Sequence, residues 1–355
     1  MAKILITGAG SAQSNGCIHC LLEDRNDEII GSGSDRHDLM FCRAHRRYLV
    51  PHSTASGYKE TLLKLLANER PDMIHFQHDM ELAVALTFRD EIEALGLKMI
   101  VPDYETIDTC VHKYKSWLKF KAAGLKVPEN MVINNDNDLK KALKDLGRAN
   151  GQIWLRSMSI GNGGKGSLAT ADYEQGYDWI TRQKGWGDFM AAELLTPDSV
   201  TWLSIWHEGE LIVAQTRRRN AWAYSRIAPS GISGLTKISE TVSSPEIDDI
   251  AQKACLAVCP RPHGIYGVDM TYDFAGIPNP TEINISRFFT TIEFFARAGL
   301  NMPVIFKNLC LYGQKPDLVH KLNPLPNHLL WIRTMDERPI LTTEAKIKKA
   351  LTSLL

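Results

Sequence analysis

Two polar side chains in the stretch NPTEINISRF, residues 279–288, have the spacing expected of metal ligands. Glu282 and Asn284 lie two positions apart in a predicted strand, so both point to one face while Ile283 points to the other. A carboxylate and an amide oxygen side by side are hard ligands that suit Mg²⁺, and Arg287 follows just beyond them. The alternative is an edge strand whose polar face lies in water beside a surface arginine.

The strand before this stretch supplies a third oxygen ligand. In YGVDMTYDFAGIPNPTEINIS, residues 266–286, the turn DFAGIPNP joins two predicted strands. An antiparallel pairing of these strands brings Asp269 roughly opposite Glu282. Mg²⁺ at nucleotide sites is held by one or two carboxylates together with substrate phosphates, so this hairpin predicts one half of an ATP site.

A glycine-rich segment predicts the other half. In SIGNGGKGS, residues 159–167, Gly163 and Gly164 directly precede Lys165. The glycines let backbone amides approach a phosphate closely, and Lys165 and the strand residue Arg156 add positive charge. The spacing is not GxxxxGK[ST] and no clear helix follows, which favours a hairpin lid over a nucleotide. The alternative is a flexible hairpin with no ligand.

Composition and charge narrow the class of protein. A chain of 355 residues with 44% hydrophobic residues predicts two or three lobes, each with its own core. Lys plus Arg and Asp plus Glu balance at 41 each, so no global field favours nucleic acid or an anionic membrane as a partner. The chain starts without a signal sequence, and no apolar stretch approaches the roughly 20 residues of a membrane span, so we expect a cytoplasmic protein.

The seven cysteines favour packing roles over disulfides or zinc. Cys17 and Cys20 form a CxxC, but the segment is predicted to be the first turns of a helix, where packing cysteines are preferred to a redox pair. Cys255 and Cys259 have the spacing of one helical face, and no second cluster supplies the remaining ligands of a structural zinc site.

The order of predicted elements indicates a mixed α/β and α+β chain. Strands and helices alternate over residues 1–105, which predicts an open parallel sheet with strands that include 98–102 and a long helix over 80–96. Residues 106–195 contain helices and the glycine-rich segment, and residues 196–317 show the two-residue period of an antiparallel sheet. The tail, residues 318–355, carries no pattern that assigns it a role.

Taken together, these residues resemble the ATP-grasp superfamily over about residues 3 to 315, and most closely the ATP-binding halves of the carbamoyl phosphate synthetase large subunit and related carboxylate-amine ligases. EINISR is similar to the E-x-N-P-R motif of that family. IWLRSMSIGNGGKGS resembles its strand and glycine lid, and VHKYKSWLKFKAAGLKVPE resembles its D-K helix. The resemblance implies an ATP-grasp fold with an N-terminal α/β domain, a lid subdomain, a C-terminal lobe with the metal site, and a tail.

The resemblance also implies roles for individual residues. The metal ligands would be Asp269, Glu282 and Asn284. The implied nucleotide contacts are Lys113 and Arg156 at the phosphates, Gly163, Gly164 and Lys165 in the lid, Glu193 and Leu195 at the adenine hinge, and Asp198 as the nearest candidate at the ribose.

Three arginines are the implied catalytic residues. Arg287 would lie beside the transferring phosphoryl group, and Arg217 and Arg219 in TRRR are candidates for contacting an acyl phosphate. TRRR is equally compatible with a solvated strand end. The chain departs from the family pattern at His112, which replaces an Asp, and in one extra residue before Arg287, which shifts the direction of that side chain by one strand position.

These likenesses imply an ATP-dependent ligase that activates a carboxylate as an acyl phosphate and joins it to an amine, with ATP and Mg²⁺, or Mn²⁺, as cofactors. Small-molecule carboxylates and amines are the implied partners, and a homo-oligomer is compatible with the sequence. Phosphoryl transfer needs positioning and charge neutralisation more than a protein nucleophile, in agreement with the cations found. A nucleotide-binding regulator without turnover is the alternative. A dinucleotide-dependent oxidoreductase is disfavoured, because the G-x-G-x-x-G spacing would require glycine where Gln13 stands.

Overall fold

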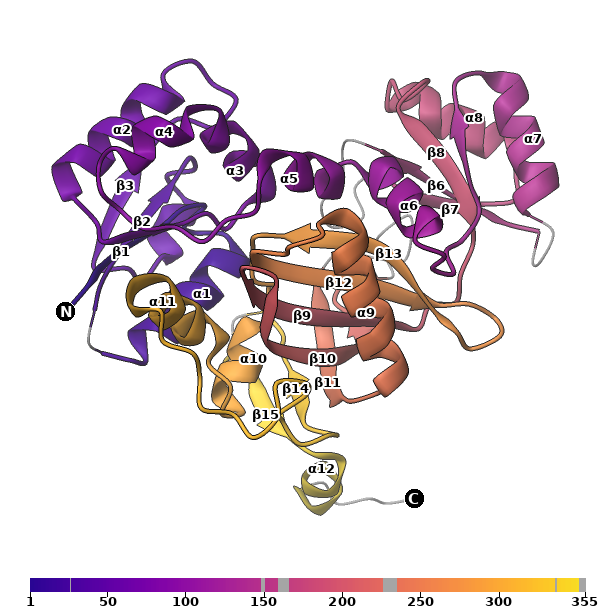
Figure 1. Cartoon of the computed structure of the whole chain (residues 1–355). Helices are drawn as coiled ribbons and strands as arrows, with labels where there is room; N and C mark the ends of the chain where they lie inside the picture. The colour runs from indigo at the N-terminus through magenta and orange to yellow at the C-terminus, as the bar shows by residue number, and fades with distance from the viewer. Residues whose placement is uncertain (26, 148–150, 159–165, 226–234, 336, 351–355) are drawn as a thin grey trace.

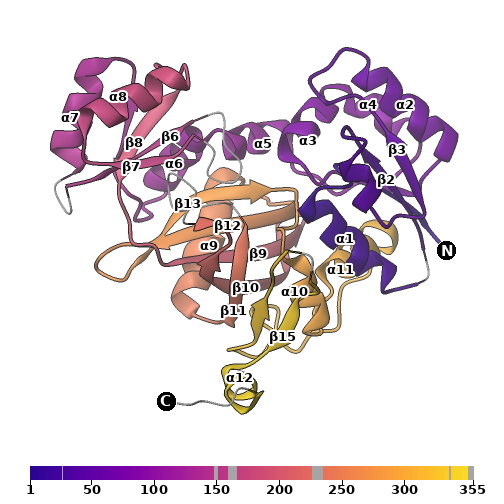
Figure 2. The same ribbon diagram turned by 180° about the vertical axis from the view of Figure 1, so that it is seen from behind.

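The computed structural model contains three β-sheets in the described part of the chain, which is residues 1–355 without 26, 148–150, 159–165, 226–234, 336 and 351–355. A parallel sheet and a small antiparallel sheet lie on opposite sides above a large antiparallel sheet (Figure 1). The same arrangement is seen from behind in Figure 2. The mixed α/β and α+β class predicted from the sequence is confirmed.

The first lobe is built on a parallel sheet with strand order β3-β2-β1-β4. Alternate residues of the central strand β1 pack to opposite faces: Leu5 shares a core with Leu62 of α2, and Ile4 shares another with Ile18 of α1. The elements of the lobe are β1 (Lys3–Ile6), α1 (Ala12–Leu22), β2 (Glu28–Gly33), η1 (Asp38–Phe41), β3 (Arg46–Leu49), α2 (Tyr58–Glu69), β4 (Met73–His75), α3 (Asp79–Ala85), η2 (Leu86–Phe88) and α4 (Arg89–Glu93).

Two predictions for this lobe are wrong. The strand expected over 98–102 is a single parallel bridge between Lys98 and Met73, and the fourth strand of the sheet is β3, whose RRYL sequence carries no clear strand pattern. The helix expected over 80–96 is divided into α3, η2 and α4. At the division, the hydroxyl of Thr87 donates to the carbonyl of Val84 at 2.7 Å and competes with the helical pattern.

The second lobe is a four-stranded antiparallel sheet with its own core. Its strand order is β5-β8-β6-β7, and α7 and α8 pack against it around residues such as Leu139, Leu155 and Ile180. The elements from the connecting helices onward are α5 (Tyr104–Val111), α6 (Lys113–Ala122), β5 (Asn130–Ile133), α7 (Asp136–Leu146), β6 (Ile153–Ser157), β7 (Leu168–Thr170), α8 (Tyr173–Arg182) and β8 (Phe189–Glu193).

The third and largest sheet has seven strands in the order β13-β12-β9-β10-β11-β14-β15. One face carries α9, held by a hydrogen bond from Trp202 Nε1 to Asp248 at 2.9 Å. The other face packs on α10, where Phe294 stacks on Trp331. The elements are β9 (Ser199–His207), β10 (Glu210–Trp222), β11 (Thr236–Val242), α9 (Pro245–Val258), β12 (Gly264–Tyr272), β13 (Pro278–Ile285), α10 (Ile292–Arg297), α11 (Met302–Tyr312), β14 (Leu330–Ile332), β15 (Ile340–Thr342) and α12 (Glu344–Ala350).

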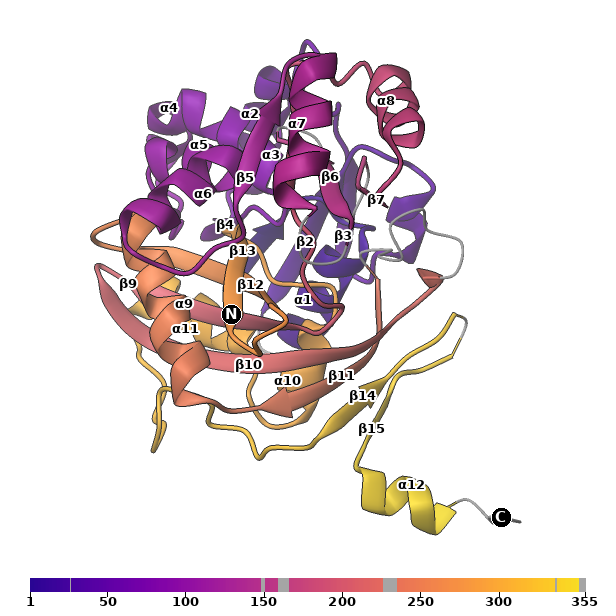
Figure 3. The ribbon, with the colours of Figure 1, turned by 90° about the vertical axis from the view of Figure 1, so that its right-hand side faces the viewer.

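The C-terminal segment extends the large sheet. β14 pairs with β11, and β15 pairs with β14, so part of residues 318–355 continues the sheet that holds Asp269 and Glu282. α12 projects away from the body of the molecule at the end of β15 (Figure 3). Within the described residues, no helix has both the length and the apolar character needed to cross a bilayer.

Candidate active site

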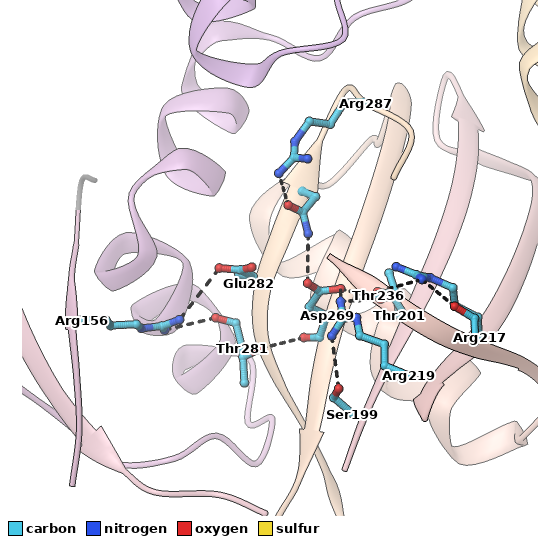
Figure 4. Close-up of polar contacts among 12 residues, drawn as sticks. Arg156, Ser199, Thr201, Arg217, Arg219, Thr236, Asp269, Thr281, Glu282 and Arg287 are labelled. Carbon is cyan, nitrogen blue, oxygen red and sulfur yellow. Dashed lines mark hydrogen bonds and ion pairs between the residues drawn. The ribbon is translucent and has the colours of Figure 1, made fainter. Parts of the chain in front are cut away.

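A single row of paired residues runs across four strands of the large sheet and defines the site. Arg217 on β10 is paired with Thr201 on β9, Thr201 with Asp269 on β12, and Asp269 with Glu282 on β13. The expectation that the β12–β13 hairpin brings Asp269 opposite Glu282 is confirmed by this register. Because paired residues project to the same face, the row carries a cation at one end and carboxylates at the other (Figure 4).

Asp269 has a protein partner at each carboxylate oxygen. Its Oδ1 accepts hydrogen bonds from Arg219 Nη2 at 2.5 Å and from Thr201 Oγ1 at 2.8 Å. Its Oδ2 accepts from Asn284 Nδ2 at 3.2 Å. The Asp269–Arg219 ion pair is largely buried, with side-chain exposures of 13% and 9%, so Arg219 is not part of a solvated strand end.

Asn284 links the carboxylates to Arg287. Its amide oxygen accepts a hydrogen bond from Arg287 Nη2. Strand β13 ends at Ile285, and Ser286 takes a left-handed φ of 56°. This turn absorbs the extra residue of the motif, so that Arg287 returns to the side of Asn284 and its Nε lies 3.4 Å from Asp79 Oδ2.

Glu282 is the carboxylate of the row that faces the small lobe. Its Oε2 lies 3.9 Å from Arg156 Nη1 of β6, which is beyond hydrogen-bond distance, and Arg156 Nη2 donates instead to the carbonyl of Thr281 at 3.3 Å. The Glu282 side chain keeps 32% of its surface exposed. It therefore retains the freedom to bind a cation.

Lys113, the first residue of α6, adds a further positive charge. Burial lowers the pKa of Lys113 below its ordinary value, and the nearby charge of Glu282 opposes that shift. Arg156, Arg287 and Asp79 also act on Lys113 electrostatically. Lys113, Arg156, Glu282 and Arg287 therefore lie near one another, although they come from three elements and a loop. Their roles at a nucleotide stay predictions.

Arg217 lies deeper in the sheet than its neighbours. It is 3% exposed, its guanidinium stacks 4.1 Å from the ring centre of Phe289, and Nη1 donates to Ser239 Oγ at 3.0 Å and Thr236 Oγ1 at 3.3 Å. Among the described residues, no carboxylate lies within ion-pair distance of it, and its Nε has no hydrogen-bond acceptor. Burial lowers the pKa of Arg217, and the adjacent Arg219 adds to that effect.

The residues expected at the adenine and ribose lie where the chain crosses from the small sheet to the large one. Glu193 ends β8, and its backbone N–H donates to the carbonyl of Glu129 at 3.1 Å. Leu195 is half-buried, and Asp198 is exposed with its carbonyl accepting from Tyr272 N–H at 3.0 Å. These positions stay predictions for nucleotide contacts. Gly163, Gly164 and Lys165 lie outside the described residues.

The glycine-containing loop between β1 and α1 forms hydrogen bonds within itself. Gly10 N–H donates to Asn15 Oδ1 at 3.2 Å, and Asn15 Nδ2 donates back to the Gly10 carbonyl at 3.0 Å. A Cβ atom at Gly10 would lie 2.5 Å from the Asp38 backbone. These glycines therefore serve close packing against η1, as the broken dinucleotide spacing suggested.

Sequence reasoning missed three residues around the site. Asp79 at the start of α3 pairs with Arg287, Phe289 covers Arg217, and Arg333 from the C-terminal segment donates to the Thr290 carbonyl at 3.0 Å. The position of Asp79 in MIHFQHD, just after a buried strand, offered a weak signal, since polar residues at strand ends often line sites. Arg333 offered none, because its segment carried no recognisable pattern.

The cysteines of this chain are buried or partly buried thiols. All seven cysteines are free, and burial raises the pKa of the Cys17 and Cys20 thiols within α1. In the part of the chain that the structure describes, no three His, Cys, Asp or Glu side chains cluster in a metal-binding geometry. A metal at this site would therefore need oxygen ligands from a bound substrate in addition to the protein side chains.

No protein-family model and no curated protein sequence matches this chain. Solved structures do. An L-amino acid ligase from Bacillus licheniformis superposes with a TM-score of 0.67 at 10% identity over 93% of this chain and 79% of that one. A carboxyaminoimidazole ribonucleotide synthase from Aspergillus clavatus, solved with ATP, gives 0.69 at 13% identity over 93% and 81%.

A biotin carboxylase domain of the Hydrogenobacter thermophilus 2-oxoglutarate carboxylase, in complex with MgADP, ADP and bicarbonate, gives a TM-score of 0.70 at 14% identity over 94% of this chain and 74% of that one. The chain has the ATP-grasp fold. The fold expected from the sequence is confirmed. The division into a lid, residues 106–195, and a C-terminal lobe, residues 196–317, stays a prediction.

Proposed function

We propose that this ATP-grasp protein is an ATP-dependent ligase that activates a carboxylate as an acyl phosphate and then joins the acyl group to an amine. The structural neighbours named above include proteins solved with ATP or MgADP, and one is an amino acid ligase. In the first step a carboxylate oxygen attacks the γ-phosphorus and ADP leaves. In the second the amine nitrogen attacks the acyl carbon, phosphate leaves, and the amine loses a proton to solvent or to a base.

The cations around Glu282 are arranged to hold the triphosphate. Lys113 and Arg156 approach Glu282 from α6 and β6, and Arg287 approaches from the end of β13. Preorganised positive groups of this kind stabilise the charge that develops on a transferring phosphoryl group. Arg287 can exchange its contact with Asn284 for a phosphate oxygen while Asp79 continues to orient it.

The observation that carries the proposal is the buried cation Arg217 at the other end of the same row. A buried guanidinium without a carboxylate partner among the described residues is costly unless an anion joins it. Arg217 is separated from Glu282 by the two intervening strands β9 and β12, on one face of the sheet. We assign it to the substrate carboxylate, with Phe289 fixing the guanidinium plane.

The side chains present fit a divalent cation in part. Glu282 is free to bind one, and the amide oxygen of Asn284 becomes available when Arg287 turns to a phosphate. Bound there, Mg²⁺ would neutralise phosphate oxygens as the γ-phosphoryl group is transferred. Asp269 fits less well, because protein donors already occupy both of its oxygens.

A hydroxylamine trap tests the proposal. The protein is incubated with MgATP, hydroxylamine and each member of a panel of amino acids and other carboxylates, and both ADP and hydroxamate are measured. We expect at least one carboxylate to give hydroxamate and ADP in equal amounts. Arg217→Met should abolish hydroxamate formation but leave ADP binding intact, and Arg218→Gln, an exposed neighbour on the opposite face, should change neither.

A second candidate is a nucleotide-binding regulator without turnover, and one observation favours it. The ion pair between Arg219 and Asp269 leaves one carboxylate fewer to bind the metal ion that would neutralise the phosphates. A protein of this kind would bind MgADP yet release no ADP from MgATP with any carboxylate. The hydroxylamine experiment therefore separates the two candidates.

A further inference from the structure

Arg219 forms an ion pair with Asp269, one of the two carboxylates in the row across the large sheet. Arg219 lies on β10, two residues beyond Arg217 and on the same face. It donates to Asp269 Oδ1 at 2.5 Å and to Thr201 Oγ1 at 2.6 Å, and it lies 3.3 Å from Ser199 Oγ. Its guanidinium also stacks 5.0 Å from the ring centre of Trp222.

We propose that the Arg219–Asp269 ion pair takes the place of a second metal ion, so that the nucleotide site holds a single divalent cation on Glu282 and Asn284. This inference rests on the proposed function, because it concerns the metal that accompanies the nucleotide. Two-metal phosphoryl-transfer sites hold their ions about 3.5–4 Å apart on shared carboxylates. Here Asp269, the carboxylate opposite Glu282, is already neutralised by the protein.

Electrostatic attraction and burial favour keeping the Arg219–Asp269 ion pair intact. Arg219 and Asp269 are 9% and 13% exposed, and separating a largely buried pair leaves two poorly solvated charges. A divalent ion bound to Asp269 would lie next to the guanidinium and be repelled by it. The other hydrogen bonds of Arg219 go to the neutral hydroxyls of Ser199 and Thr201, so the guanidinium has no second carboxylate partner among the described residues.

Arg287 behaves differently, although it too contacts a proposed ligand. It donates to the oxygen of Asn284, but its Nε faces Asp79 at 3.4 Å. Arg287 can therefore release Asn284 and keep a carboxylate partner. Arg219 has no second carboxylate partner among the described residues to replace Asp269. Asn284 is therefore available to a metal, and Asp269 is not.

Counting bound Mn²⁺ tests this inference. The protein is saturated with β,γ-methylene-ATP and titrated with Mn²⁺, bound Mn²⁺ is counted by equilibrium dialysis, and its electron paramagnetic resonance spectrum is recorded. We expect one nucleotide-dependent Mn²⁺ per wild-type chain, with the spectrum of an isolated ion. Arg219→Gln keeps donors for Thr201 and Asp269 but removes the charge, and should bind two Mn²⁺ with a spin-coupled spectrum.

Matched variants separate charge from position. Arg219→Lys keeps a cation beside Asp269 and should hold one Mn²⁺, and so should Arg218→Gln on the opposite face. If the wild-type protein binds two spin-coupled Mn²⁺ ions, the inference is wrong whether or not any variant folds. The proposed function is unaffected by that result. A folded, nucleotide-bound Arg219→Gln protein with one Mn²⁺ also overturns it. If no Mn²⁺ binds to the wild-type protein with nucleotide, the proposed function fails and the inference fails with it.

Discussion

Neighbouring residues on β13 should separate activity from stability, because their side chains point to opposite faces of the sheet. Glu282 faces Arg156 and the site, and Ile283 is 3% exposed in the core, paired with Val268. Glu282→Gln should nearly abolish turnover in a folded protein. Ile283→Ala should do the reverse, with turnover largely kept at low temperature and the free energy of unfolding reduced.

The magnitudes follow from burial and distance. Ile283→Ala removes buried carbons from a packed core, and such changes cost about 2–5 kcal/mol of unfolding free energy. Glu282 is 32% exposed and its Oε2 lies 3.9 Å from Arg156 Nη1, so neutralising Glu282 should change the free energy of unfolding by less than about 1 kcal/mol. Loss of the metal-binding carboxylate should lower kcat at least about 100-fold, equivalent to about 2.7 kcal/mol in the barrier.

Urea unfolding and ADP release measured on the same preparations check this prediction. The circular dichroism spectrum of each variant is compared with that of the wild type to check that the hairpin stays folded. Wild-type turnover in Glu282→Gln would refute the assignment and indicate that β13 presents only a solvated polar face. A drop in stability of Glu282→Gln as large as that of Ile283→Ala would refute the face argument itself.

Three further predictions concern other parts of the chain. Burial lowers the pKa of Lys113, so the charged form that binds phosphate is lost as pH rises through that lowered pKa. In calorimetric titrations at increasing pH, ADP affinity should therefore begin to fall before the pH reaches the ordinary lysine pKa near 10.4, and Lys113→Met should lose this pH dependence. Asn323 donates to both Asp248 oxygens at 2.9 Å, so Asn323→Ala should lower the urea-unfolding free energy by about 1–3 kcal/mol. Desolvation raises the pKa of the Cys310 thiol to about 12, and the other six cysteines are buried. A thiol reagent should therefore label the folded protein slowly, and it should label all seven cysteines in denaturant.

Short-range pattern was sufficient to predict the centre of the site. The turn between residues 272 and 278 sets the first pairs of β12 and β13, so local sequence places Asp269 near Glu282. A one-residue register shift between Asp269 and Met270 then brings Asp269 directly opposite Glu282, and the turn alone does not predict that shift. The strand that carries Arg156 also has a clear alternation of buried and partly buried residues. These elements could be placed without knowing the order of strands in the large sheet.

The partner of Asp269 could not be predicted in this way. Arg219 reaches Asp269 because β9 lies between β10 and β12, an order set by long-range pairing. The left-handed turn at Ser286, which directs Arg287 back to Asn284, occurs in a residue that seldom adopts it. Arg333 joins the site region only because β14 pairs with β11, and its three-residue strand is too short to carry a period.

Calorimetric titration with nucleotide tests the central claim most directly, namely that the cations around Glu282 hold the phosphates of ATP. The wild-type protein, Arg156→Met and Glu282→Gln are each titrated with ADP, with and without Mg²⁺, and with NAD. We predict that the wild-type protein binds ADP more tightly with Mg²⁺ than without it, and that it does not bind NAD. Arg156→Met should weaken ADP binding, and Glu282→Gln should remove the effect of Mg²⁺. Binding of NAD without binding of MgADP, or MgADP affinities equal in all three proteins, would contradict the account.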